Sequence, residues 1–207
     1  MSWLPAILPA LLVAGSWVYC VLTVIAARRY RAVRPPAAAR FPPISILKPL
    51  HGLDEGLEEN LRSFFEQDYP SFEILFAARE ASDPGLAVAA RLQREYPHVP
   101  SRSFVTGEPP YPNAKSWSLE IMMREAAHGL LVMSDSDIRT APDLLRVIAS
   151  EFQDPSLAVA TCPYRAAPGR SFWSTLEAIG MNTEFWGGAL VARLVEGGIR
   201  FAVGPTI

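Results

Sequence analysis

The chain has 207 residues, of which half are hydrophobic, and a formal net charge of −2 at pH 7. This length fits one domain of ordinary size with an appendage, and the near-neutral charge gives no sign of a nucleic-acid-binding surface, so we expect no nucleic-acid partner. The two cysteines, Cys20 and Cys162, lie far apart, which excludes a disulfide framework and a structural zinc site and fits a reducing cytoplasm.

The first predicted element is an apolar block from Leu4 to Ala27 without a charged residue. A helix of this length is long enough to cross a bilayer. Arginines follow the block at positions 28, 29, 31 and 34, and none precedes it. This asymmetry predicts that residues 1–29 form a transmembrane anchor and that the following domain is cytoplasmic. A cleaved signal peptide is the alternative, but it would carry its positive charge before a shorter apolar run.

A proline-rich linker over residues 30–43 follows the anchor, because prolines at this density disfavour both helix and strand. We expect a cytosolic domain over residues 44–207. Residues 199–203 have the pattern of a strand, and no polar tail follows them. We therefore expect the chain to be the N-terminal part of a longer protein, with the domain incomplete at its C-terminal end.

Within this domain, predicted strands alternate with predicted helices. The strands are expected at residues 44–48, 72–78, 102–106, 130–134 and 157–161. The helices are expected at residues 56–67, 83–96, 114–127 and 140–152. This alternation predicts an α/β fold with a doubly wound, mostly parallel sheet of the Rossmann-like type.

A last helical segment, from Ser171 to about Val195, is rich in aromatic residues. Two interpretations are equally favoured. The segment is an amphipathic helix packed on the sheet, or it lies against the membrane or a lipid acceptor.

The most informative motif follows the fourth predicted strand, where an apolar run from Leu130 to Met133 leads to Asp135 and Asp137. Ligands of open α/β sheets bind at the carboxyl ends of strands, and alternate side chains of an extended segment point the same way. Two carboxylates held this close repel each other unless a cation lies between them. The motif predicts a Mg²⁺ or Mn²⁺ site that also contacts phosphates. A polar loop that caps the next helix is the alternative.

Three further strand ends should meet this motif at the same edge of the sheet. They carry Lys48 and Pro49 after the first strand, Glu80 and Asp83 after the second, and Asn113 and Lys115 beyond the third. A nucleoside diphosphate needs such groups: a strand end for the base, a carboxylate for the base or ribose, and a lysine for the diphosphate. The simpler interpretations are a strand-end charge that reaches solvent for Lys48 and a turn residue for Asn113.

The pattern resembles the inverting nucleotide-sugar glycosyltransferases of the GT-A fold, and most of all the ceramide glucosyltransferase family with its bacterial relatives that glycosylate hopanoids. The resemblance covers the chain after the linker. It rests on five motifs in order, at residues 46–50, 65–70, 83–84, 113–115 and 135–139. It implies transfer of a glucose-type sugar from a UDP-sugar to a lipid hydroxyl with inversion. The resemblance favours ceramide as the acceptor, and the reaction would then belong to glycosphingolipid biosynthesis. The alternative acceptor is a hopanoid that receives N-acetylglucosamine.

The resemblance also implies roles for single residues. Asp83 matches the family's first aspartate, expected at the nucleoside, and Glu80 competes for that role. Asp135 matches the second aspartate, and Asp137 completes the pair that binds the metal.

By the same resemblance, Lys115 matches a lysine expected near the diphosphate, and Lys48 and Pro49 flank the base pocket. Asn113 belongs to the same motif as Lys115. The general base and the Gln-x-x-Arg-Trp motif of the family would lie beyond Ile207, and the full protein would contain further membrane spans.

Two alternatives come from other functional classes: an Asp-x-Asp phosphatase, and a membrane protein that binds a sugar nucleotide without turnover. The phosphatases usually have Thr or Val two residues after the second aspartate, where this chain has Arg139. They also carry the motif on the first strand of the domain rather than the fourth.

Overall fold

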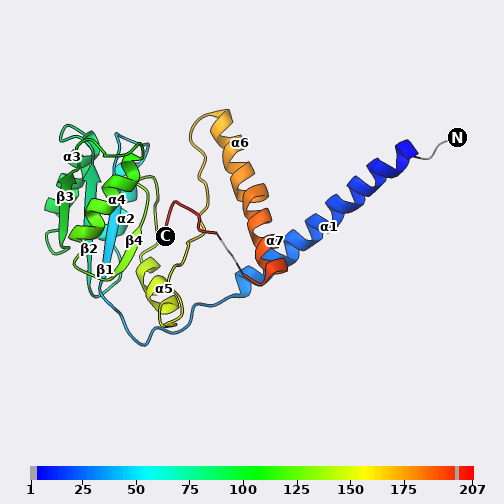
Figure 1. Ribbon diagram of the computed structural model, residues 1–207, viewed down its shortest axis with the longest axis horizontal. Coiled ribbons are helices and arrows are strands. Elements are labelled where there is room, and N and C mark those ends of the chain that lie inside the picture. The colour runs from blue at the N-terminus through cyan, green and yellow to red at the C-terminus, as the bar shows by residue number, and fades with distance from the viewer. Residues whose placement is uncertain (1–3, 199–200) are drawn as a thin grey trace. The chain divides into compact units, whose positions relative to one another are not determined.

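The computed structural model describes residues 4–198 and 201–207 (Figure 1). They form two compact units. The first comprises Met1–Arg34 with Tyr164–Phe201, and the second comprises Pro35–Pro163 with Ala202–Ile207. Residues 164–198, which the sequence assigned to the domain after the linker, therefore share a unit with the predicted anchor.

The first unit contains helix α1 (Leu4–Ala32), which covers residues 4–29 of the predicted anchor; residues 1–3 lie outside the described residues. Two of its hydroxyls are satisfied within the helix: those of Ser16 and Thr23 donate to carbonyls four residues earlier, at 2.9 Å each. Of the helices in residues 4–198 and 201–207, this one is long and apolar enough to cross a membrane, over residues 7–32. Residues 30–32 of the predicted linker still belong to α1, and residues 33–43 form neither helix nor strand.

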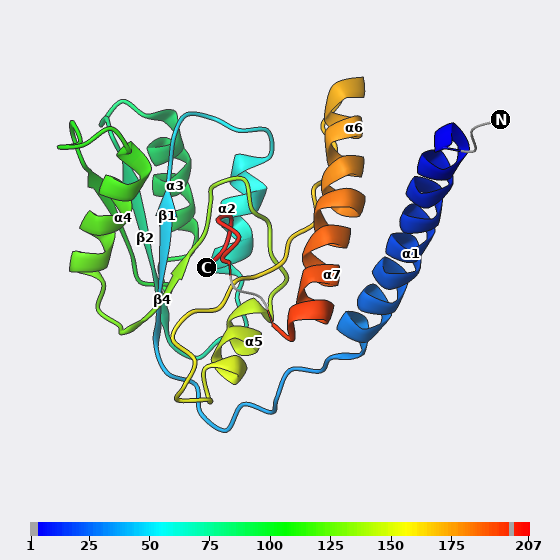
Figure 2. The ribbon, with the colours of Figure 1, turned by 45° about the vertical axis from the view of Figure 1, so that its right-hand side comes forward.

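The second part of this unit is a continuous helical segment, as the sequence predicts for residues 171–195. It consists of α6 (Phe172–Gly180), the π-helical turn η1 (Met181–Phe185) and α7 (Trp186–Glu196), and Figure 2 shows the three in line. Helix α7 packs on α1, where a Cβ added at Gly187 would lie 3.2 Å from Thr23 Cγ2. Helix α6 leaves Phe172 and Trp173 exposed.

The second unit contains a sheet of four parallel strands in the order β3-β2-β1-β4. The strands are β1 (Ile44–Pro49), β2 (Phe72–Ala78), β3 (Ser101–Val105) and β4 (Leu130–Met133). The helices are α2 (Leu57–Phe65), α3 (Pro84–Glu95), α4 (Ala114–Glu125) and α5 (Leu144–Glu151). These elements confirm the predicted parallel α/β fold.

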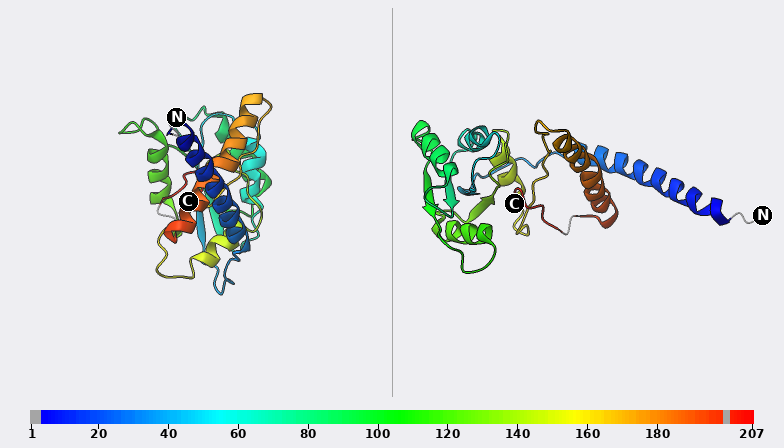
Figure 3. Two further views of the ribbon diagram at one scale, coloured as in Figure 1. Left: turned by 90° about the vertical axis from the view of Figure 1, so that its right-hand side faces the viewer. Right: turned by 90° about the horizontal axis from the view of Figure 1, so that it is seen from above.

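Helices cover both faces of this sheet, so the central strands are apolar on both sides (Figure 3). Ile46 on β1 belongs to a core that also contains Phe64 of α2. Leu47, the next residue along β1, belongs to a smaller core with Met122 of α4. The alternation fixes which β1 side chains face α2 and which face α4.

The fifth predicted strand is wrong. Residues 157–161 form no strand, and Val159 is 62% exposed. The edge of β4 is occupied instead by the end of the chain, which runs antiparallel to it: Met133 and Ile207 exchange two backbone hydrogen bonds, of 2.8 and 3.0 Å. The pairing residues are therefore 205–207 rather than the predicted 199–203, of which 199 and 200 lie outside the described residues.

Candidate functional site

The predicted metal motif lies in a turn directly after β4. The strand ends at Met133, and the Asp135 carbonyl accepts a hydrogen bond of 3.3 Å from the Ile138 amide, which closes a turn over the motif. The argument from an extended segment therefore does not describe Asp135 and Asp137. Asp135 is 30% exposed in its side chain, and Asp137 is exposed. Both carboxylates remain open to solvent at the carboxyl end of the sheet.

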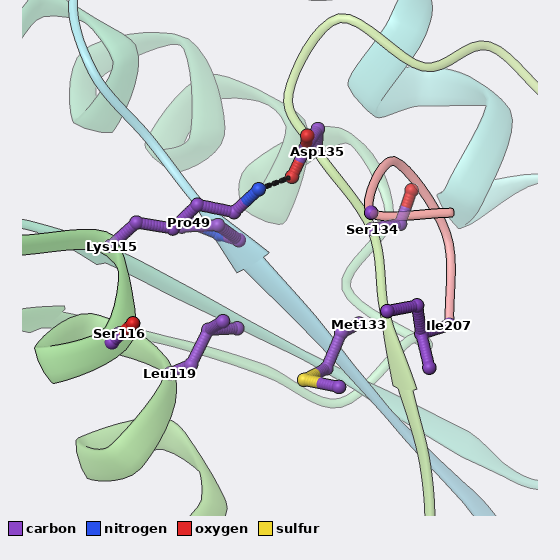
Figure 4. A pocket seen from close by; sticks show the side chains of 9 residues that line it. Pro49, Lys115, Ser116, Leu119, Met133, Ser134, Asp135 and Ile207 are labelled. Atoms are coloured by element: carbon purple, nitrogen blue, oxygen red, sulfur yellow. Dashed lines mark ion pairs between the residues drawn. The ribbon is translucent and has the colours of Figure 1, made fainter. Parts of the chain in front are cut away.

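The structure brings Lys115 and Asp135 together, as the sequence predicts from the ends of two different strands. Lys115 Nζ lies 2.5 Å from Asp135 Oδ1 (Figure 4). Lys115 stands in the first turn of α4, which Asn113 caps by accepting a 3.0 Å hydrogen bond from the Ser116 amide. The cap explains why an asparagine precedes the lysine by two residues, and it places the ammonium at the sheet edge.

Lys48 does not reach solvent, because its side chain is fully buried. Its ammonium donates to the Asp135 carbonyl at 2.5 Å and to Ser134 Oγ at 3.3 Å, and it lies 3.7 Å from the centre of the Phe64 ring. Burial lowers the pKa of Lys48 to about 7, while the Asp135 and Asp137 carboxylates oppose that shift. The expectation of a strand-end charge that reaches solvent is wrong for this residue.

Asp83 joins the loop after β1 to the start of α3. Its carboxylate accepts from the Gly85 amide at 2.8 Å, which caps α3, and from the Gly52 amide at 3.0 Å. Glycine at position 85 avoids a tight contact there, since a Cβ would lie 3.1 Å from the Gly52 carbonyl oxygen. Glu80, the competing candidate, is exposed and accepts a 3.4 Å hydrogen bond from the Ser82 hydroxyl.

Replacing Asp83 by alanine should lower the free energy of unfolding by about 1–2 kcal/mol, because the helix loses its cap and the Gly52 amide loses its acceptor. Asp83→Asn keeps a capping oxygen and should retain most of the stability. Urea denaturation measures both variants. If Asp83→Asn is as stable as wild type but binds UDP more weakly, the carboxylate contacts the nucleoside. Equal stability of Asp83→Ala and wild type would contradict the capping role.

A pocket of about 190 Å³ lies at the Lys115–Asp135 pair (Figure 4). It is lined by Pro49, Lys115, Ser116, Leu119, Met133, Ser134, Asp135, Gly204 and Ile207. Sequence reasoning missed its apolar part. Leu119 could have been found, because it stands four residues after Lys115 and shares its helix face. Ile207 could not, because its place depends on the antiparallel pairing with β4.

The residues of the turn fit a divalent cation of the hard type. No group of three or more His, Cys, Asp or Glu side chains able to hold a metal occurs in the described part of the chain. Two carboxylates are nevertheless a sufficient protein contribution for Mg²⁺ or Mn²⁺, which complete their coordination with water and substrate phosphates. In this structure the Asp135 carboxylate lines the pocket and pairs with the positive charge of Lys115.

Among solved structures, the mannosyltransferase PcManGT from Pyrobaculum calidifontis, in complex with GDP-Man and Mn²⁺, has a similar fold, with a TM-score of 0.60. The two chains are 22% identical, and the match covers 83% of this chain and 49% of the other. At this identity the likeness shows the fold alone, and it confirms the predicted GT-A type.

Curated sequences support a closer relationship. Ceramide glucosyltransferase 1 of Caenorhabditis elegans is 32% identical over 126 residues, which cover 60% of this chain and 27% of the relative. Ceramide glucosyltransferase of Komagataella phaffii is 43% identical over 67 residues, which cover 32% of this chain and 13% of the relative. The chain thus spans about a quarter or less of the length of these relatives. The model of glycosyl transferase family 21 matches residues 8–207, and the chain therefore belongs to this family.

Proposed function

We propose that the whole protein transfers a glucose-type sugar from a UDP-sugar to the hydroxyl of a membrane lipid. The acceptor that we propose is ceramide. Membership of glycosyl transferase family 21 and the two ceramide glucosyltransferase relatives support this proposal. The observation that carries it is the Lys115–Asp135 pair over a pocket at the carboxyl end of the sheet. A cation and a carboxylate side by side are the groups that a nucleoside diphosphate and its metal require.

In this mechanism the described residues bind and activate the donor. Asp135 and Asp137 would hold a Mg²⁺ or Mn²⁺ ion, which supplies positive charge to the departing diphosphate. Lys115 turns from Asp135 to a diphosphate oxygen and neutralises the charge that develops as the sugar leaves. Pro49 borders the pocket beside the expected base.

The acceptor hydroxyl would attack the anomeric carbon from the opposite side, so a single displacement inverts that carbon. A general base must remove the hydroxyl proton. In this proposal the base belongs to the rest of the whole protein, of which the described residues supply the donor half.

The test is an assay of the whole protein with radiolabelled UDP-glucose and UDP-N-acetylglucosamine, each offered ceramide or a hopanoid. We expect a ceramide-linked glucose product that depends on added Mg²⁺ or Mn²⁺. Transfer of N-acetylglucosamine to the hopanoid alone would replace the acceptor and sugar but keep the reaction. Release of phosphate without formation of any glycolipid would favour the Asp-x-Asp phosphatase. Binding of UDP without either product would favour a membrane protein that binds a sugar nucleotide without turnover.

The same proposal puts the sheet unit in the cytoplasm, because UDP-sugars are made there and because arginines follow the apolar block Leu4–Ala27 and none precedes it. Protease added to sealed cells should leave the sheet unit intact, and protease added after permeabilisation should digest it. Digestion from outside in sealed cells would reverse the orientation and contradict the proposed donor.

A further inference from the structure

Lys48 is a buried cation at the end of β1 that the donor chemistry described above does not use. Its side chain has no exposed surface, and its ammonium donates to a backbone carbonyl and a hydroxyl. Taking a charge out of water is costly unless it makes strong contacts. Methionine or leucine at this position would fill similar space without that cost, so the ammonium must contribute something that an apolar side chain would not.

The acceptor that Lys48 contacts belongs to the turn that carries both carboxylates. The Asp135 carbonyl oxygen accepts a hydrogen bond of 2.5 Å from the Lys48 ammonium and one of 3.3 Å from the Ile138 amide. The same oxygen that closes the turn therefore also binds a side chain of β1. Ser134, the residue before it, accepts from the same ammonium at 3.3 Å.

The ammonium nitrogen also lies 3.7 Å from the centre of the Phe64 ring. Lys48 therefore connects the α2–β1 core to the backbone of Asp135, while the carboxylate of Asp135 faces the pocket and pairs with Lys115.

We propose that Lys48 is a positioning residue: its ammonium fixes the backbone of the Asp135–Asp137 turn in the conformation that binds the divalent cation. This inference rests on the proposed function, since it concerns the cation that the donor brings to the turn. It assigns Lys48 no contact with the nucleotide and gives the buried amine a role through Asp135.

The sign of one measured change separates this role from a purely electrostatic one. An ammonium near a cation site repels the cation, so removing its charge would by itself tighten cation binding. If Lys48 holds the turn, its removal frees the Asp135 carbonyl, the two carboxylates lose their mutual placement, and cation binding weakens. Groups that orient the ligands of a metal typically change its affinity by about 10–100-fold.

The experiment measures Mn²⁺ binding by electron paramagnetic resonance, in the presence of saturating UDP, for the whole protein and for Lys48→Met. Methionine keeps the length of the side chain and its contact with the Phe64 ring but cannot donate a hydrogen bond. We expect Mn²⁺ to bind about 10-fold or more weakly, and we expect much of the transfer rate to return at saturating Mn²⁺.

Phe64→Leu is the matched control, because it alters the packing of the core around the Lys48 side chain and leaves both hydrogen bonds of Lys48 in place. It should change Mn²⁺ affinity little even if it lowers stability. If Lys48→Met does not fold, Lys48→Gln, which has a shorter polar side chain, takes its place. Its affinity for Mn²⁺ should also be lower than that of wild type.

Unchanged or tighter Mn²⁺ binding by a folded Lys48 variant would overturn the positioning role. A loss of Mn²⁺ affinity in Phe64→Leu equal to that in Lys48→Met would also overturn it, since the effect would then be one of core packing. If the wild-type protein binds no Mn²⁺ with UDP, it is the proposed function that fails.

Discussion

Asp135→Asn should reduce sugar transfer by the whole protein by at least about 10²–10³-fold, the size of effect seen when one group that stabilises transition-state charge is removed. The asparagine keeps the shape of the side chain but loses the charge that pairs with Lys115 and would bind the cation. The fold should persist, because the Asp135 backbone keeps its hydrogen bonds to Pro205, Ile138 and Lys48. The transfer rate measures the loss of activity, and Mn²⁺-dependent UDP binding measures the loss of the cation site. Urea denaturation shows whether the fold persists.

Asp143→Asn is the matched control for this variant. Asp143 is exposed in the same unit, precedes α5, and makes no side-chain capping hydrogen bond. The same chemical change there should leave transfer and UDP binding as in wild type. If Asp135→Asn binds UDP and Mn²⁺ like the wild-type protein, the proposed cation site is wrong.

The second large effect concerns the pH dependence of stability, through Lys48. Burial lowers its pKa from 10.5 to about 7 in the folded chain, whereas the unfolded chain keeps the ordinary value. Between about pH 7 and 10.5 the unfolded state therefore binds more protons, and the free energy of unfolding rises with pH through that window. Each pKa unit corresponds to about 1.4 kcal/mol, so the rise from this residue amounts to several kcal/mol.

Lys48→Met lacks this contribution. We therefore consider the free energy of unfolding of Lys48→Met minus that of wild type. This difference should be largest below pH 7 and should decrease by several kcal/mol as the pH approaches 10. Pulse proteolysis in a urea series, scored by peptides from β1 and β4, measures the sheet unit of both proteins. Parallel pH profiles for the two proteins would contradict a depressed pKa at Lys48.

The strands and helices of the sheet unit could be predicted because local physics determines them. The central strands are apolar on both faces, which gives continuous hydrophobic runs, and the helices α3 and α4 begin at Asp83 and Asn113, whose side chains cap them. The order of the strand ends then brought Lys115 and Asp135 to one edge.

What could not be predicted depends on contacts between distant segments. Residues 157–161 have a strand-like pattern, yet Pro205 and Ile207 make the backbone hydrogen bonds at the edge of β4 that a fifth strand would need. The burial of Lys48 depends on Phe64 and on the Asp135 carbonyl, and neither is near it in sequence. The packing of Gly187 on Thr23 likewise joins two helices that are far apart in sequence.

The π-helical turn at Met181–Phe185 has a consequence for how this part of the chain tolerates insertion and deletion during evolution. A π turn holds more residues than an α turn, so a sequence shortened by one residue here could continue as a regular α-helix. Because the π turn carries about one residue more than an α turn over the same rotation, the deletion would leave the aromatic face of α6 and the glycine face of α7 in about the same relative orientation. A single-codon deletion at this turn would therefore keep the direction of Phe172 and Trp173, whereas the same deletion within a regular part of the helix would rotate them by about 100°.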